Sequence, residues 1–258
     1  MDDWDPEHYG TYADERSRPY GDLVRRILAP EARRVVDLGC GSGELTASLR
    51  RRWPRAEIVG VDASPAMINH ARTLRTDDDI RFLERDLRDW RPDRGTDVMI
   101  SNAVLQWVPE HRGLLPDLVD RLSPGGWLAF QVPGNFGEPS HLLLHELAGS
   151  GPYAAHTADL LRPTSAEPGD YLADLVALGC TVDVWETTYL HVLGGEDAVF
   201  TWISATGARP VLAALPDDLR PEFEQEYKVR LRHAYPEQPY GTVLPFRRIF
   251  VVARTDNP

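Results

Sequence analysis

The first half of the chain alternates between short apolar runs and stretches in which apolar residues recur three or four positions apart. A short apolar run bounded by turn residues predicts a buried strand, and the wider spacing predicts an amphipathic helix. Strands are predicted over 34–38, 56–61, 80–83, 98–100 and 127–132. Repeated strand–helix units predict a parallel sheet with helices on both faces, and right-handed crossovers make it doubly wound. We therefore predict an α/β protein with a Rossmann-like sheet.

Local signals place helices between these strands. The apolar spacing over 45–53 and 114–122 predicts two of them, and residues 22–28 predict a short helix ahead of the first strand. Ser64 followed by Pro65 is typical of a helix start, because serine caps the first turn and proline fits its first position.

The second half has a different pattern. Residues 134–180 are rich in glycine and proline and predict loops and helices, whereas residues 195–240 are mostly helical, with apolar residues every four positions. Two further strands are predicted over 182–192 and 243–252. With the five strands of the first half they predict a sheet of seven strands.

A glycine-rich turn, Asp37-Leu38-Gly39-Cys40-Gly41-Ser42-Gly43, ends the first predicted strand. Open α/β sheets bind ligands at this edge, and glycines let a ligand approach the backbone. A dinucleotide fingerprint starting at Gly39 places its third glycine at Glu44, whose carboxylate repels a pyrophosphate. No Gly-Lys-Ser/Thr sequence follows, which excludes a P-loop. S-adenosylmethionine has no phosphate and carries positive charge, so it is compatible with Asp37.

Polar residues also follow the next three predicted strands. Asp62 ends the second, where a carboxylate can accept from both ribose hydroxyls, and Asp86 with Leu87 follows the third and suits the adenine. Asn102 follows the fourth, near the expected methionine end of the cofactor. Each aspartate alone is equally compatible with a cap or turn, but the set favours cofactor binding. The predicted cofactor-binding residues are Asp37, Gly39, Cys40, Gly41, Gly43, Asp62, Ala63, Asp86, Leu87, Asn102, Ala103 and Trp107.

Composition narrows the classes of partner. A net charge of −12 argues against nucleic acid or an anionic membrane, but not against a small anionic substrate. The sequence has no apolar run of about eighteen residues and begins with an acidic stretch, so neither a membrane span nor a secretory signal is expected. Cys40 and Cys180 form neither a disulfide framework nor a metal-spaced cluster. We expect a cytoplasmic protein.

Several longer segments carry a family resemblance. The clearest is 101–111, Ser-Asn-Ala-Val-Leu-Gln-Trp-Val-Pro-Glu-His. Further segments are 52–54, 131–133, 139–141, 185–189, 206–210, 234–236 and 245–250, with 4–9 and 16–19 near the N-terminus. Together they resemble the trans-aconitate 2-methyltransferases, which are class I methyltransferases. Ala208 departs from the family, which usually has a larger aliphatic residue there, and Ser42 stands where proline is frequent.

The resemblance implies methyl ester formation on a carboxylate of trans-aconitate. A carboxylate is already ionised at neutral pH, so proximity, alignment and removal of water suffice. We therefore predict no obligatory catalytic residue and no metal. Two alternatives stay open: O- or N-methylation of another small molecule, and a non-catalytic module that binds the cofactor.

A tricarboxylate needs cationic partners, and arginine pairs with carboxylates through two parallel hydrogen bonds. Arg247 and Arg248 lie on opposite faces of the last predicted strand among apolar residues, which is as compatible with edge-strand arginines as with substrate contacts. The predicted substrate-binding residues are Arg18, Gln106, His191, Arg209, Tyr235, Arg247 and Arg248, with His141 as a weaker candidate.

These roles divide the chain into three parts. Residues 1–30 form an arm and helix over the active site, with Trp4, Tyr9 and Tyr12 expected either to cover the cofactor or to pack on the sheet. Residues 31–133 form the cofactor-binding core. Residues 134–258 complete the sheet and carry helical substrate-cap inserts over about 134–180 and 195–240. Both a monomer and a homodimer are compatible with the sequence.

Overall fold

The computed structural model describes residues 13–74, 80–160 and 162–256, which form two compact units. The first unit comprises Met1–Val132, Ser165–Thr187 and Ile249–Pro258. The second comprises Pro133–Thr164 and Thr188–Arg248. Both units are therefore assembled from segments that are separated in the sequence.

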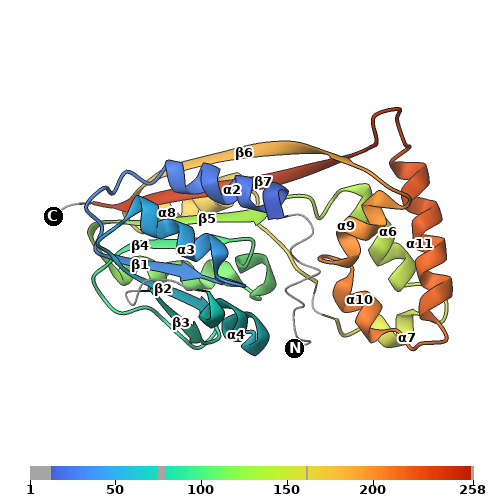
Figure 1. Ribbon diagram of the computed structural model, residues 1–258, viewed down its shortest axis with the longest axis horizontal. Coiled ribbons are helices and arrows are strands. Elements are labelled where there is room, and N and C mark those ends of the chain that lie inside the picture. Colours follow the sequence, from blue (N-terminus) through green and yellow to red (C-terminus); the bar gives the residue numbers. More distant parts are fainter. Residues whose placement is uncertain (1–12, 75–79, 161, 257–258) are drawn as a thin grey trace. The chain divides into compact units, whose positions relative to one another are not determined.

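Among the described residues, seven strands form one sheet in the order β3-β2-β1-β4-β5-β7-β6. The strands are β1 (Arg34–Leu38), β2 (Glu57–Asp62), β3 (Ile80–Glu84), β4 (Thr96–Asn102), β5 (Leu122–Pro133), β6 (Cys180–Leu193) and β7 (Thr242–Thr255). Strands β1 to β5 pair in parallel, with Asp37 opposite Gly60 of β2 and Ile100 of β4. In Figure 1, β7 runs against β5, so the sheet is mixed. The predicted seven-stranded Rossmann-like sheet is confirmed.

The helices of the first unit lie between the strands and ahead of the first one. They are α2 (Ala13–Arg25), α3 (Glu44–Arg52), α4 (Pro65–Thr73), α5 (Leu115–Asp120) and α8 (Pro168–Ala177), with 3-10 turns η1 (Leu105–Trp107) and η2 (His111–Leu114). The Ser64 side chain accepts a hydrogen bond from the Met67 N–H at 3.3 Å, and Pro65 occupies the first turn of α4. The predicted cap is confirmed. Helix α2 contacts β4, α3 contacts β2, and α4 contacts β2 and β3.

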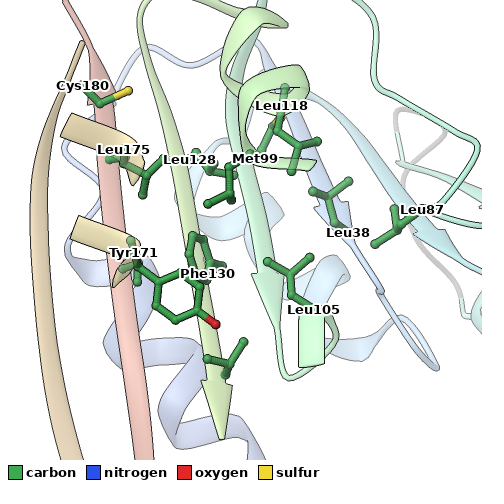
Figure 2. Packing of buried hydrophobic residues seen from close by; sticks show 14 of the residues in the cluster. Leu38, Leu87, Met99, Leu105, Leu118, Leu128, Phe130, Tyr171, Leu175 and Cys180 are labelled. Atoms are coloured by element: carbon green, nitrogen blue, oxygen red, sulfur yellow. The ribbon is translucent and has the colours of Figure 1, made fainter. Parts of the chain in front are cut away.

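Helices α5 and α8 contribute to one hydrophobic core of the first unit (Figure 2). Phe130 of β5 is fully buried and meets Tyr171 of α8 edge-on, with ring centroids 5.1 Å apart. Leu175 of α8 packs in the same cluster, and each buried side chain of this kind contributes about 1.5–3 kcal/mol. The Tyr171 hydroxyl accepts from the Ala166 N–H at 3.0 Å and lies 2.7 Å from His111 Nε2, so its polar end is satisfied.

The second unit is mostly helical, as predicted. Its helices are α6 (Pro139–Ala148), α7 (Ala154–Thr157), α9 (Ala198–Ser204), α10 (Arg209–Ala214) and α11 (Arg220–Ala234). The four-residue spacing marks the buried face of α11, which carries Phe223, Tyr227 and Leu231. Tyr227 donates to the Ser140 carbonyl at 2.6 Å, and the Tyr235 hydroxyl accepts from the Ser140 N–H at 3.1 Å. Two tyrosines therefore fasten the first turn of α6 to α11.

Several predicted boundaries differ from the structure. The first helix is Ala13–Arg25 rather than 22–28, because its buried face already includes Tyr20. The helix predicted over 114–122 ends at Asp120, because Leu122 pairs with Thr96 as part of β5. Residues Ser165–Thr187, of which the part up to 180 was assigned to an insert, group with the first unit because α8 packs in its core. No helix in the described ranges is long and apolar enough to cross a membrane.

Candidate active site

The glycine-rich turn joins β1 to α3 at the carboxyl end of β1. Gly39 has φ of 81°, and a Cβ there would lie 2.6 Å from Val104 Cγ1, so a larger residue cannot be placed without displacement. Gly41 has φ of 53°, and no heavy atom of the described residues lies within 4 Å of a Cβ built on it. The turn is therefore packed against the protein at Gly39 and accessible to a ligand at Gly41.

The end of β2 fastens this turn. Two of the turn's N–H groups donate to the Val61 carbonyl, and the Gly41 N–H donates to Asp62 Oδ2 at 2.9 Å. The Ser64 N–H donates to Asp62 Oδ1, also at 2.9 Å. Burial raises the pKa of Asp62 above its ordinary value, and these backbone donors oppose the rise. Each carboxylate oxygen has a second acceptor position, so Asp62 can also accept from hydroxyls of a ligand.

Asp37 of β1 is 2 % exposed and receives two hydroxyl donors. Thr46 of α3 donates to its Oδ2 at 2.6 Å, and Tyr20 of α2 donates to the same oxygen at 3.1 Å. Burial raises the pKa of Asp37 to about 6, while both donors favour the ionised form. Burial, with the charges of Asp37 and Asp62, also raises the pKa of the Cys40 thiol. Cys40 therefore stays protonated and is no nucleophile.

Two side-chain amides, those of Asn102 and Gln106, lie at the end of β4 and in the 3-10 turn η1 that follows it. The Gln106 amide donates through Nε2 to the carbonyl of Ala103 at 2.7 Å, and Ala103 has a left-handed φ of 57°. Gln106 Oε1 and Asn102 Oδ1 are buried and have no hydrogen-bond partner among the described residues. A buried acceptor without a donor is costly. Both oxygens therefore suit a ligand that donates hydrogen bonds, such as one with an ammonium group.

The two residues predicted to contact adenine, Asp86 and Leu87, already have partners within the protein. Asp86 follows β3 and pairs with Arg88, whose Nη2 lies 2.6 Å from Asp86 Oδ2 and whose hydrogen bonds lower the pKa of Asp86. Leu87 is buried in the hydrophobic core. Arg88 occupies much of the acceptor capacity of Asp86, so the contact of Asp86 and Leu87 with adenine stays a prediction.

The hydrogen-bond acceptors of the site suit S-adenosylmethionine. Asp37, Asp62, Asn102 and Gln106 offer oxygen acceptors, which suit the hydroxyl and ammonium groups of a positively charged cofactor. Glu44 lies in the first turn of α3, where its carboxylate disfavours a pyrophosphate. Ala63 and Trp107, also predicted to bind the cofactor, are half-buried. Their contact with the cofactor stays a prediction.

The N-terminal candidates have little support. Arg18 of α2 is exposed and lies 4.0 Å from Asp22 on the same helix. Trp4, Tyr9 and Tyr12 lie outside the described residues. A role of this segment in covering the cofactor stays a prediction.

The second unit brings a histidine and an arginine to one aromatic cluster. His191 stacks on Trp202 with centroids 4.6 Å apart and lies 6.0 Å from the ring of Phe246. The Arg248 guanidinium lies over the same Phe246 ring at 4.4 Å and is 4 % exposed. Two of the predicted substrate residues, His191 and Arg248, therefore lie against the same aromatic ring, that of Phe246.

The remaining candidates of the second unit have other surroundings. Arg247 donates to the Gly134 carbonyl at 3.1 Å, and Arg209 is the first residue of α10. Tyr235 anchors α6, which is a sufficient structural reason for its burial. Burial lowers the pKa of His141 to about 4, so His141 is neutral and does not attract an anion.

Sequence reasoning missed three polar residues of interest. Tyr20 and Thr46 were not recognised as donors to Asp37, because a hydroxyl on a helix gives no signal of what it meets in the fold. Asn135 was also missed; it is 2 % exposed, and its Oδ1 has no hydrogen-bond partner within the described ranges.

Comparisons with known proteins identify the class of protein. A methyltransferase-domain family profile matches residues 12–167. An S-adenosylmethionine-dependent methyltransferase from Mesorhizobium loti superposes with a TM-score of 0.54 at 20% identity, covering 91% of this chain and 96% of that one. The cyclase SpnF superposes with a TM-score of 0.60 at 15% identity, covering 99% and 87%, so the fold alone does not define the reaction. Fold, profile and site together define a class I S-adenosylmethionine-dependent methyltransferase.

Closer relatives give the family. The trans-aconitate 2-methyltransferase of Streptomyces coelicolor is 50% identical, with 97% of this chain and 86% of that protein covered. Those of Streptomyces avermitilis and Mycobacterium tuberculosis are 48% and 47% identical, covering 98% and 97% of this chain and 97% and 96% of theirs. The chain belongs to the trans-aconitate 2-methyltransferase family.

Proposed function

We propose that this enzyme transfers the methyl group of S-adenosylmethionine to a carboxylate oxygen of trans-aconitate, forming a methyl ester. The observation that carries the proposal is the 47–50% identity to trans-aconitate 2-methyltransferases over nearly the whole chain. This identity includes the second unit, where Arg248 and His191 lie, as well as the first.

We assign cofactor binding to the first unit. The accessible backbone at Gly41 and the acceptors of Asp62 suit the adenosine, while Asp37 and Asn102 suit the cationic groups. Gln106 was predicted to contact substrate, but its free amide oxygen disfavours a carboxylate and suits the cofactor's ammonium group. We therefore propose that Gln106 contacts the cofactor rather than the substrate. The bound cofactor supplies an electrophilic methyl group on a positively charged sulfur.

The acceptor needs placement rather than activation. A carboxylate is ionised at neutral pH, so no general base is required. A buried guanidinium such as that of Arg248 stays charged and can hold the carboxylates that do not react. Alignment of acceptor and methyl group can supply about 7–11 kcal/mol of the barrier. Arg209, Arg247 and His191 remain additional candidates for substrate binding.

The direct test is turnover. Purified enzyme is incubated with S-adenosylmethionine and trans-aconitate, and the methyl ester is followed by mass spectrometry, with cis-aconitate, citrate and an amine as competing acceptors. We expect trans-aconitate to be methylated with the highest kcat/KM. No ester above an enzyme-free control, with cofactor binding verified, contradicts the substrate assignment, and preference for the amine favours N-methylation.

A matched pair of arginine variants tests the substrate site. Arg248→Met removes the buried charge, whereas Arg254→Met removes an exposed arginine on the same strand that lies 5.7 Å from the Trp127 ring. Loss of one charge-assisted contact predicts a rise in KM for trans-aconitate of roughly tenfold or more in the first variant and little change in the second. Equal effects of both variants contradict a substrate role for Arg248.

We also propose that the enzyme acts in the cytoplasm on a free small molecule. The net charge of −12 and two buried free cysteines support a reducing compartment and a partner other than nucleic acid. Fractionation of cells that produce the protein tests the location.

A further inference from the structure

Helix α2 contacts Asp37, at the start of the cofactor turn, through the hydroxyl group of Tyr20. Tyr20 is 4 % exposed, and its hydroxyl donates to Asp37 Oδ2 at 3.1 Å. Burial, followed by the charge of Asp37, raises the pKa of Tyr20 well above its ordinary value. Tyr20 therefore remains protonated and acts as a donor throughout the physiological pH range.

Both hydroxyl donors to Asp37 use the same carboxylate oxygen. Thr46 also donates to Oδ2, at 2.6 Å, and none of the described residues donates to Oδ1. One oxygen is thus held from inside the protein by α2 and α3, and the other keeps its acceptor capacity. A carboxylate anchored in this way has a defined orientation and one face left for a ligand.

We propose that Tyr20 is a positioning residue for cofactor binding: its hydroxyl holds one oxygen of the Asp37 carboxylate, so that the other oxygen is oriented for the positively charged cofactor. The same hydrogen bond favours the ionised form of Asp37. The inference rests on the proposed role of Asp37 in holding S-adenosylmethionine. The neighbourhood of Asp37 explains why a donor is needed there.

The groups that face Asp37 act on its charge in opposite directions. They are Tyr20 from α2, Thr46 from α3, Cys40 from the turn and Asp62 from β2. Burial raises the pKa of Asp37 most strongly, and the charge of Asp62 adds to it, whereas the hydrogen bonds from Thr46 and Tyr20 lower it. The resulting pKa is about 6, so Asp37 is mostly ionised at neutral pH.

Removal of the Tyr20 hydroxyl therefore raises the pKa of Asp37. A cationic ligand favours ionised Asp37, so its affinity falls as the pH drops through that pKa. Loss of a hydrogen bond to a charged group moves the midpoint up by about one pH unit. Relative to the wild type, affinity then falls about fivefold at pH 6 and about twofold at pH 7, and is nearly equal at pH 8.

The experiment is calorimetric titration with S-adenosylhomocysteine, which keeps the amino group of the cofactor, from about pH 5.5 to 8.5. The proteins are the wild type, Tyr20→Phe, Thr46→Val and Tyr171→Phe. Tyr171→Phe is the matched control, because it removes a buried hydroxyl of the same unit that bonds Ala166 and His111 rather than Asp37. Comparison at each pH cancels any titration of the ligand itself.

We expect the profiles of Tyr20→Phe and Thr46→Val to move to higher pH and that of Tyr171→Phe to coincide with the wild type. A Tyr20→Phe profile that coincides with the wild type, or that is weaker by the same factor at every pH, overturns the inference. Asp37→Asn distinguishes this failure from failure of the proposed site. If Asp37→Asn binds the ligand weakly at every pH, the role of Asp37 in cofactor binding stands, whatever the result for Tyr20→Phe. If Asp37→Asn binds as tightly as the wild type, the role of Asp37 and the inference on Tyr20 are both overturned.

Discussion

Replacement of Gly39 by alanine tests the packing that shapes the cofactor turn. An added Cβ lies 2.6 Å from Val104 Cγ1 and 2.7 Å from Val104 Cβ, well inside van der Waals contact, and the backbone has φ of 81°. The left-handed backbone costs alanine about 1–2 kcal/mol. Overpacking costs about 1–3 kcal/mol more. We therefore expect Gly39→Ala to lower the free energy of unfolding by about 2–5 kcal/mol in urea titrations, and to weaken S-adenosylhomocysteine binding.

Two companion variants separate these costs. Gly41→Ala shares the positive φ but meets no heavy atom of the described chain within 4 Å, so it should lose only about 1–2 kcal/mol. Val104→Ala in the Gly39→Ala background removes the closest methyl groups and should restore part of the lost stability. If Gly39→Ala and Gly41→Ala cost the same, contact with Val104 does not shape the turn and the reasoning is refuted.

Three further predictions concern the cofactor site and stability. Asp62→Ala removes the acceptor of two backbone N–H groups and should raise the Kd for S-adenosylhomocysteine roughly ten- to hundredfold with unchanged circular dichroism; unaltered affinity disproves its role. Tyr171→Phe should lower the free energy of unfolding by about 1–3 kcal/mol in urea without a change in this Kd, and a weaker ligand complex contradicts that separation. Burial lowers the pKa of His141 from 6.5 to about 4, so the unfolded chain binds the extra proton and stability falls as pH drops from 6.5 towards 4. His141→Gln should show a smaller fall than the wild type in urea titrations, and parallel curves argue against this origin.

The cofactor half of the site was largely predictable from the sequence. The glycine turn, the Ser64–Pro65 helix start and the carboxylate at Asp62 are local signals, each contained in a few neighbouring residues. Parallel strands place their carboxyl ends at one edge, so a list of strand ends is already a list of neighbours. For this reason the sequence alone predicted that Asp37, Asp62 and Asn102 lie at the same edge of the sheet, and their role in cofactor binding stays a prediction.

The sequence was less informative where a local pattern meets a competing interaction. Leu122 continues the apolar spacing of a helix, but pairing with Thr96 makes it the start of β5. Asp86 has the spacing of a ligand contact and also pairs with the Arg88 guanidinium, so its contact with adenine stays a prediction. Gln106 was predicted to contact the substrate because it follows the fourth strand, and the direction of its amide, which donates to the Ala103 carbonyl, supports our proposal that it contacts the cofactor instead.

By itself, then, the sequence determined the order of elements, the class of fold and the kind of cofactor, because periodicity and turn chemistry act over short windows. Only the tertiary structure decided which hydroxyls hold Asp37 and which aromatic ring lies beneath the Arg248 guanidinium. Tyr20 and Asp37 are 17 residues apart on different elements, and His191 and Phe246 are further apart still. Such pairs form because packing buries the apolar faces of whole helices and strands, and hydrogen-bonding groups carried with them must then be satisfied wherever they meet.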